Sequence, residues 1–296
     1  GGAILPGNYK GKDINIQDMF EAVGAQAQGK ISLDELLAME RVACPGEGAC
    51  AGMFTANTMS SAIEALGMSI PGAATIPAVD SDAEELSLKA GSVIYNLLKE
   101  DIKPRDIITR KSLENAITVV LAMGGSTNAA LHLPAIAHEA GITLELDDFD
   151  RLSRRTPYLT DLRPSGRFVM ADLHKSGGIP VIMKELLNAG LLHGDVITVT
   201  GKTLADNLED INVPKPDRKV IHPVSSPRSP TGGLVILKGN LAPDGSVLKV
   251  GGLKNLRHKG PARVFDGERE AFKAVTNGQI KPGDVVVIRY EGPKGG

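Results

Sequence analysis

The sequence predicts an α/β protein with a layered α/β/α domain over residues 1–215, followed by a smaller, incomplete β-barrel-like domain over residues 216–296. In the first part, segments with apolar residues at helical spacing alternate with short apolar runs, which is typical of α/β layers. A proline-rich stretch at 214–233 then indicates an extended linker. After it, short β-rich runs are separated by Asp-Gly and Pro-Asp-Gly turns, which favour a small barrel or sandwich.

Capping signals and apolar periodicity predict the elements in order along the chain. Residues 15–27 have apolar side chains at helical spacing, and Ser32 with Glu35 forms a Ser-x-x-Glu capping box before the next helix. A glycine such as Gly67 is a typical residue beyond a helix end. Residues 240–246 predict a β-hairpin around Pro-Asp-Gly. Further helices are expected from Cys50 to about residue 66, over 81–100, from 106–112 to 123, and over 129–141, 181–190 and 268–278.

The clearest chemical signal is Cys50, which a glycine-rich turn delivers to the start of a helix of small residues. Unpaired backbone N–H groups and the positive end of the dipole stabilise negative charge at a helix N-terminus. Cys50 is therefore expected to be a thiolate that attacks a substrate or binds a metal. Gly46, Gly48 and Gly52 remove side chains around it, so that an inorganic cluster or a substrate can approach the backbone.

Other interpretations of Cys50 are weaker. A disulfide with Cys44 is disfavoured because two cysteines in 296 residues are too few for a disulfide framework. The spacing of the two cysteines also lacks the Cys-x2-4-Cys pattern of a zinc site. An inert buried cysteine is a common fate for this residue type, but the surrounding glycines argue against it.

A second candidate site is the Gly-Gly-Ser-Thr-Asn turn that opens the helix expected over 129–141. Ser126, Thr127 and Asn128 are good N-cap residues, and a glycine-rich entry to a helix can bind an anion such as a carboxylate through backbone N–H groups. These residues alone support a capped, tightly packed core helix equally well. A third candidate, His174 with Lys175 before paired glycines, could contact an acidic substrate, but a solvated loop is the favoured interpretation.

Six segments, in the same order along the chain, resemble dihydroxy-acid dehydratases, within the iron–sulfur dihydroxy-acid and sugar-acid dehydratase family. One is the cysteine motif at 44–67. The others are GGAILPGNYKGKDI, MGGSTNAALHLPAIAHEAG, PSGRFVMADLHKSGGIP, GDVITVTGKTLADNL and RYEGPKGG. The collinear matches extend over essentially the whole chain, which makes the resemblance specific.

The resemblance implies a hydro-lyase that dehydrates 2,3-dihydroxy-3-methyl carboxylic acids to 2-keto acids in valine and isoleucine biosynthesis. Its implied cofactors are a [2Fe-2S] cluster held by three cysteines and a neighbouring Mg²⁺ ion. By motif match, Cys50 is the one cluster ligand in this chain, and Cys44 is not a ligand. The resemblance favours a substrate-binding role for Ser126, Thr127 and Asn128. It also implies a homodimer whose active site lies between the two domains, with Glu291 close to the site in a structural role.

In the family pattern, the other two cluster cysteines and two of the Mg²⁺ ligands precede the segment that this chain matches. The third Mg²⁺ ligand and the serine expected to act as the catalytic base follow it. No catalytic base is therefore expected within the chain, and the chain alone is expected to be inactive. An alternative function with the same reaction chemistry is that of a sugar-acid or phosphogluconate dehydratase. A non-catalytic scaffold or binding fragment is the alternative from another class.

The amino-acid composition limits the classes of partner that we expect the protein to bind. Lys and Arg number 33 against 35 Asp and Glu, aromatics are 3% and Trp is absent, so the sequence lacks the basic and stacking features of nucleic-acid binding. No apolar run has the length of a membrane span. The expected location is intracellular, either cytoplasmic or organellar (mitochondrial matrix or plastid) with the targeting segment not present.

Overall fold

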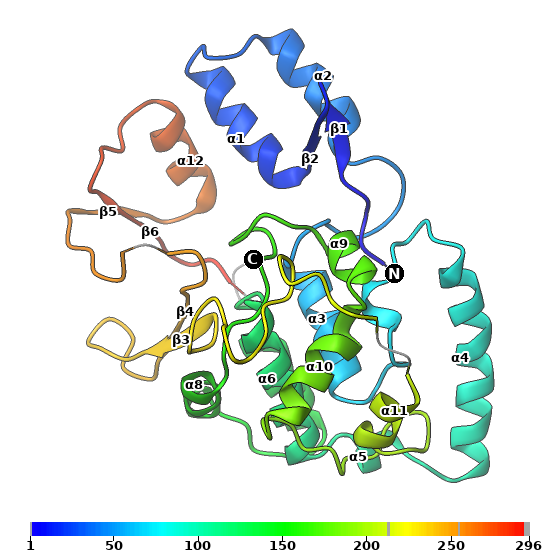
Figure 1. Cartoon of the computed structure of the whole chain (residues 1–296). Coiled ribbons are helices and arrows are strands. Elements are labelled where there is room, and N and C mark those ends of the chain that lie inside the picture. Colours follow the sequence, from blue (N-terminus) through cyan, green and yellow to red (C-terminus); the bar gives the residue numbers. More distant parts are fainter. Residues whose placement is uncertain (1, 212–213, 254, 293–296) are drawn as a thin grey trace. The chain divides into compact units, whose positions relative to one another are not determined.

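Figure 1 shows the computed structural model, which describes residues 2–211, 214–253 and 255–292. The chain divides into two compact units. The main unit comprises Gly1–Ile16 and Arg41–Gly252, and the second unit comprises Gln17–Glu40 and Leu253–Gly296. Within the described residues, no helix has both the length and the apolar character needed to cross a lipid bilayer.

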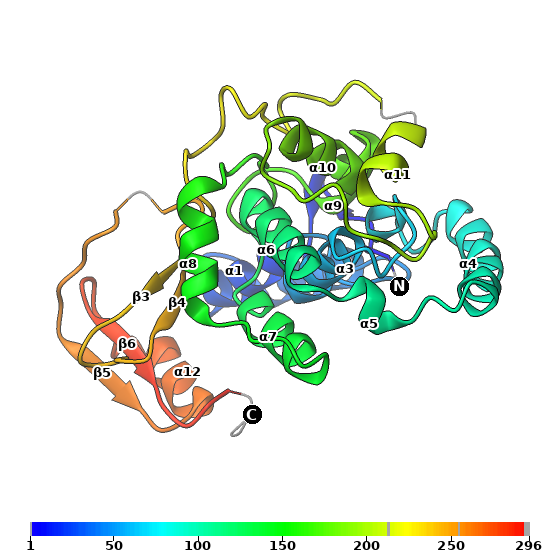
Figure 2. The same cartoon turned by 90° about the horizontal axis from the view of Figure 1, so that it is seen from below.

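Three helices form the centre of the main unit: α3 (Thr55–Ala65), α6 (Arg110–Met123) and α10 (Gly178–Asn188). They pack against one another and lie side by side in both Figures 1 and 2. Helix α6 is buried at every position from Asn115 to Met123, where its sequence is almost entirely apolar. Its limits follow the capping rules, since Thr109 accepts a hydrogen bond from the Ser112 N–H and Gly124 ends the helix with φ 62°.

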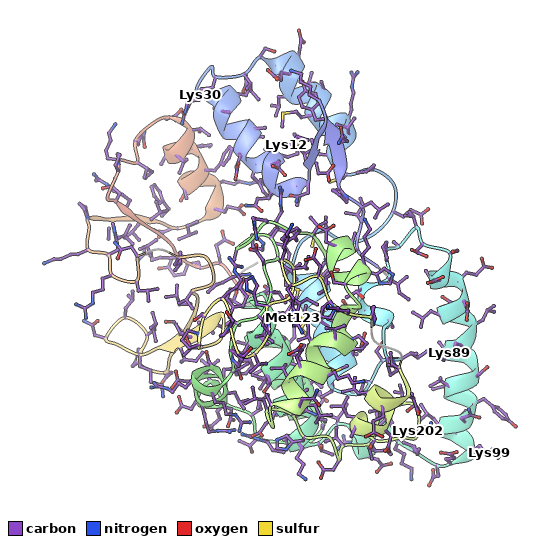
Figure 3. All side chains as sticks on the ribbon, viewed as in Figure 1. Lys12, Lys30, Lys89, Lys99, Met123 and Lys202 are labelled. Atoms are coloured by element: carbon purple, nitrogen blue, oxygen red, sulfur yellow. The ribbon has the colours of Figure 1, made fainter. Side chains whose placement is uncertain are left out.

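The other elements of the main unit surround this centre. In Figure 3, Met123 lies among the interior side chains at the end of α6, whereas Lys89 and Lys99 lie on α4, which has no buried residue. The remaining helices are α4 (Asp82–Lys99), α5 (Pro104–Ile107), α7 (Ala129–Glu139), α8 (Leu146–Arg155), α9 (Met170–Lys175), α11 (Leu204–Asp210) and the 3-10 helix η1 (Ala73–Thr75).

Two small antiparallel sheets belong to the main unit. Strand β1 (Gly7–Tyr9) pairs with β2 (Lys12–Ile14), and β3 (Leu234–Leu237) pairs with β4 (Ser246–Lys249). The β3–β4 pair confirms the hairpin predicted around residues 240–246. Its register places Leu234 opposite Lys249, and Leu234 packs in the core that α3, α6, α7 and α8 share.

The second unit contains most of two consecutive helices and a βαβ segment. Helix α1 (Ile16–Ala27) precedes α2 (Leu33–Ala43), and the Ser32 hydroxyl accepts the Glu35 N–H at 3.1 Å, which confirms the predicted cap. Strands β5 (Ala262–Phe265) and β6 (Val285–Ile288) pair in parallel, and α12 (Glu268–Thr276) connects them.

The predicted mixture of helices and strands is confirmed, but the predicted layers are not. Across the described residues the strands form three two-stranded sheets, so neither a central sheet between helix layers nor a closed barrel is seen. The reason lies in runs such as 158–162, which pair only at single positions. Tyr158 bridges to Ser229, Thr160 to Ile221 and Leu162 to Phe168. Isolated bridges of this kind give no continuous ladder.

Candidate active site

Cys50 lies in the loop that precedes α3 and is partly buried, whereas Cys44 is exposed. Both are free thiols, so the disulfide alternative is not supported. The sulfur of Cys50 lies 3.9 Å from the carbonyl oxygen of Gly52. Helix α3 begins only at Thr55, and its N-cap is Phe54, so the thiol precedes the first turn of the helix.

Burial raises the pKa of the Cys50 thiol above its ordinary value, although backbone hydrogen bonds from Phe54 and from Cys50 itself lower it. The expectation that the helix terminus makes this residue a free thiolate is therefore wrong. Desolvation has the larger effect, and the helix begins too late in the sequence to offset it. Metal binding would remove the proton, because metals bind cysteine as the thiolate.

The buried side chain of Asn57, in the first turn of α3, fixes the shape of this loop. Its Nδ2 donates to the carbonyl oxygen of Cys50, and to that of Gly52 at 2.7 Å. The Met53 N–H donates to the carbonyl oxygen of Arg163 at 2.7 Å, which joins the loop to a distant segment. Asn57 therefore holds the loop that carries Cys50, a role that the sequence analysis did not predict.

Two further backbone contacts secure the other side of the loop. The Ile4 N–H donates to the Ala49 carbonyl at 2.7 Å, and the Met170 N–H, at the start of α9, donates to the Ala51 carbonyl at 2.8 Å. With hydrogen bonds on both of its neighbours, Cys50 has a well-defined backbone position.

The glycines of the loop serve the packing of the chain itself. A Cβ at Gly48, where φ is 128°, would lie 2.6 Å from the Ile4 nitrogen. A Cβ at Gly52 would lie 2.8 Å from the Phe54 ring and 3.0 Å from the Arg163 carbonyl oxygen. Real Cβ atoms essentially never make contacts under 3.0 Å, and a contact of 3.0 Å is tighter than most. These two glycines are explained by contacts within the chain, without reference to a bound group.

The structure brings the Ser126–Thr127–Asn128 turn to the same end of α3 as the Cys50 loop. The Asn128 side chain donates to the Thr55 hydroxyl at 2.6 Å, and the Ser126 N–H donates to the Thr58 hydroxyl at 2.9 Å. Thr55 and Thr58 escaped the sequence-based prediction because nothing local in the sequence indicates contacts that join residues so far apart along the chain. The first turn of α3 therefore holds both candidate sites.

The N–H groups at the start of α7 are largely satisfied within the chain. The Asn128 N–H donates to the Ser126 hydroxyl at 3.2 Å, and the Ala129 N–H donates to the Ser126 carbonyl at 3.1 Å. The Ala130 N–H donates to the Thr127 carbonyl at 3.0 Å. Few backbone donors are left for an anion, so the side chains of the exposed Thr127 and the partly buried Ser126 are the groups that this turn can offer a ligand.

The third candidate site, at His174 and Lys175, lies at the end of helix α9 and not in a solvated loop. His174 belongs to α9, and its Nδ1 lies 3.3 Å from the Thr75 hydroxyl. Ser176 is buried and donates to the Asp172 carbonyl at 2.9 Å, while Lys175 is exposed. The interpretation as a solvated loop was thus wrong for His174, because its side chain lies against Thr75 of a neighbouring segment.

An unpredicted charged cluster lies beside a cavity of about 490 Å³ lined by residues 164–167, Asp161, His222 and Arg228. The buried carboxylate of Asp161 pairs with Arg167 at 2.5 Å and with Arg228 at 3.0 Å. Arg228 also donates to the Tyr158 hydroxyl at 3.2 Å. The sequence-based prediction had assigned Arg228 to a linker, and no local pattern pairs it with Asp161.

Among the residues that the structure describes, no group of three or more His, Cys, Asp or Glu side chains could hold a metal ion. Cys50 can supply one thiolate, but a [2Fe-2S] cluster needs ligands on both iron atoms. An Mg²⁺ ion prefers carboxylate and other oxygen ligands, and no such set surrounds Cys50 in the described segments. The described residues therefore do not form a complete metal centre.

Comparison with known proteins decides the family. The family model for the N-terminal part of dihydroxy-acid/6-phosphogluconate dehydratases matches residues 1–207, and the model for the C-terminal part matches residues 219–296. The chain belongs to this family. The resemblance seen in the six collinear segments is thereby confirmed.

Several similar proteins carry the name dihydroxy-acid dehydratase. Those of Sulfurisphaera tokodaii and Synechococcus sp. (strain JA-2-3B'a(2-13)) are each 57% identical over 297 residues, covering 100% of this chain and 53% of the relative. The protein of Acidothermus cellulolyticus is 58% identical over 295 residues, covering 100% of this chain and 52% of its own length. The chain thus spans about half the length of the curated relatives it matches.

Proposed function

We propose that the chain is part of a dihydroxy-acid dehydratase, a hydro-lyase that removes water from 2,3-dihydroxy-3-methyl carboxylic acids. The products would be the 2-keto acids that precede valine and isoleucine. The observation that carries this proposal is the match of both family models along the chain, together with 57% identity to relatives of that name.

In the whole protein, Cys50 would contribute one thiolate to an iron–sulfur cluster of the [2Fe-2S] type. Two features support this role: the thiol is only partly buried, and hydrogen bonds hold the backbone on both sides of it. Such a cluster would supply a Lewis acid for the departing hydroxyl, and an Mg²⁺ ion would supply positive charge for the substrate's oxygen atoms. The other ligands of both metals would come from parts of the protein outside this chain.

The residues of this chain would position the site. Asn57 holds the Cys50 loop, and Thr55 with Thr58 holds the turn at Ser126 and Asn128 on the same helix end. We propose that Ser126, Thr127 and Asn128 line the substrate pocket. The hydroxyls of Ser126 and Thr127 would face the substrate, and Asn128 would fix the turn.

We propose the same architecture for the whole protein as the sequence predicts. Residues 1–215 would belong to a layered α/β/α domain, and residues 216–296 to a barrel-like domain. The active site of a homodimer would lie between these domains. Residues from both domains could then contribute to the site, and their closure could exclude water.

Enzyme assays on the full-length protein, purified without oxygen, test the proposal. We expect conversion of 2,3-dihydroxyisovalerate to 2-oxoisovalerate, and little turnover of gluconate or 6-phosphogluconate. The family model covers 6-phosphogluconate dehydratases as well, so the reverse preference would replace this function with the sugar-acid alternative. A colourless protein that contains no iron and turns over none of these acids would contradict both enzymatic proposals and favour a scaffold.

A further inference from the structure

Lys249 is the last residue of β4 and extends from the face of the hairpin that packs on the core. It lies opposite Leu234, and directly opposed residues of an antiparallel pair place their side chains on the same face. Leu234 is 1% exposed and belongs to the core cluster that includes Leu121 and Leu152. The aliphatic part of Lys249 therefore leaves the strand toward the interior.

The ammonium group of Lys249 has no hydrogen bond or ion pair with any residue in the described part of the chain. Burial lowers its pKa to about 8, and no nearby charge opposes that effect. Lys238, on the same hairpin, shows the ordinary arrangement, since its ammonium pairs with Asp147 at 2.6 Å near the surface. A largely buried cation without a partner is costly, so its presence indicates a counter-charge supplied from elsewhere.

The backbone next to Lys249 lies against the turn that opens α7. The Val250 N–H donates to the Gly233 carbonyl at 2.9 Å. A Cβ at Gly233 would lie 2.6 Å from the Cα of Gly124, so these two backbones touch. Gly124 leads directly into Ser126, whose turn has most of its N–H donors occupied. The backbone at Lys249 is therefore joined through Gly233 to the segment that leads into the Ser126 turn, and Ser126, Thr127 and Asn128 carry no charge themselves.

We propose that Lys249 binds the carboxylate of the substrate. The inference deepens the proposed function and rests on it, because a dihydroxy acid carries one fixed negative charge. An ammonium–carboxylate hydrogen bond is charge-assisted, and it is stronger still when partly shielded from water. A carboxylate offers about four lone-pair sites, so Lys249 and a metal ion can bind it together.

The test compares an acid with its neutral amide in the full-length, iron-loaded protein. The variants are Lys249→Met, which removes the charge at similar volume, Lys249→Arg, and the matched control Lys238→Met from the same hairpin. For Lys249→Met we expect KM for 2,3-dihydroxyisovalerate to rise at least about 30-fold with iron content unchanged. Turnover of 2,3-dihydroxyisovaleramide should change little. Lys249→Arg should restore part of the affinity, and Lys238→Met should behave as wild type.

Binding measured by calorimetry, with isovalerate and isovaleramide as probes, gives a readout that needs no turnover. If the wild type binds isovalerate through Lys249 but converts no dihydroxy acid, the proposed function fails and the carboxylate site stands. If the wild type is active and Lys249→Met keeps its KM, the inference fails alone. Equal losses for acid and amide, or a loss of iron in Lys249→Met, would assign Lys249 a structural partner elsewhere in the protein and overturn the inference.

Discussion

The side-chain amide of Asn57 donates to the carbonyl oxygens of both Cys50 and Gly52, so one buried residue of α3 fixes the loop that carries the thiol. Asn57→Ala would leave these carbonyls without their donor. We expect a loss of about 1–3 kcal/mol in the free energy of unfolding and a matching drop in bound iron in the full-length protein. Urea denaturation and iron analysis measure the two effects. The control is Asn96→Ala, at an exposed position of α4. Wild-type iron content in Asn57→Ala would contradict this role.

Gly52 packs too closely for a side chain. In Gly52→Ala the new methyl group would collide with the Phe54 ring and the Arg163 carbonyl, so we expect the loop to shift at a cost of about 1–3 kcal/mol. Gly91→Ala is the control, since no atom lies within 4 Å of a Cβ in this exposed stretch of α4. That variant should gain up to about 1 kcal/mol from helix propensity. Thermal unfolding of the two variants separates the effects, and equal stability would exclude the steric explanation.

Glu64 is a fully buried carboxyl on α3 that accepts the N–H groups of Gly72 and Ala74 at 2.8 Å each. Burial raises its pKa from 4.5 to about 7, against these two donors, which lower it. The folded state therefore holds the proton more tightly than the unfolded state. Its contribution to stability is complete below pH 4.5 and is lost as the pH rises through 7.

Glu64→Gln is neutral at every pH and lacks this dependence. The difference between the free energies of unfolding of wild type and Glu64→Gln should therefore fall by up to about 3 kcal/mol between pH 4.5 and pH 7. Urea denaturation across this range measures it, and Glu84→Gln, at an exposed position of α4, should show no such slope. A difference independent of pH would mean that Glu64 stays ionised in the folded state.

Asp161 joins two arginines from separate segments, and its side chain is 5% exposed. Asp161→Asn would leave Arg167 and Arg228 without their counter-charge. We expect a loss of about 2 kcal/mol, less than for a fully buried pair because Arg167 is mostly exposed. Asp150→Asn is the matched control, because Asp150 pairs with Arg154 on the surface and should cost at most about 1 kcal/mol. Similar losses in both variants would show that the cluster around Asp161 adds nothing.

Local signals in the sequence predicted several helix ends correctly, although α8, α9 and α11 were not predicted. The Ser32 cap of α2, the start of α4 at Ser81–Asp82 and the glycine after α3 lie where the sequence predicts them. These features depend on hydrogen bonds between residues a few positions apart, which a sequence pattern records directly.

The contacts of the candidate site could not be predicted in the same way. Asn128 donates a hydrogen bond to Thr55, and Arg228 forms an ion pair with Asp161. The residues of each pair are far apart in the sequence, so only the folded structure brings them together. The protonation of Cys50 was mispredicted for a similar reason. Its pKa depends on burial by segments distant in sequence as well as on the nearby helix end.

The central claim is that Cys50 is a ligand of an iron–sulfur cluster and Cys44 is not. The most direct measurement is the iron content and visible absorbance of full-length Cys50→Ser and Cys44→Ser proteins, each purified without oxygen beside the wild type. We predict that Cys50→Ser loses the cluster absorbance and most of its iron, while Cys44→Ser keeps both. Equal retention or equal loss in the two variants would contradict the assignment of Cys50.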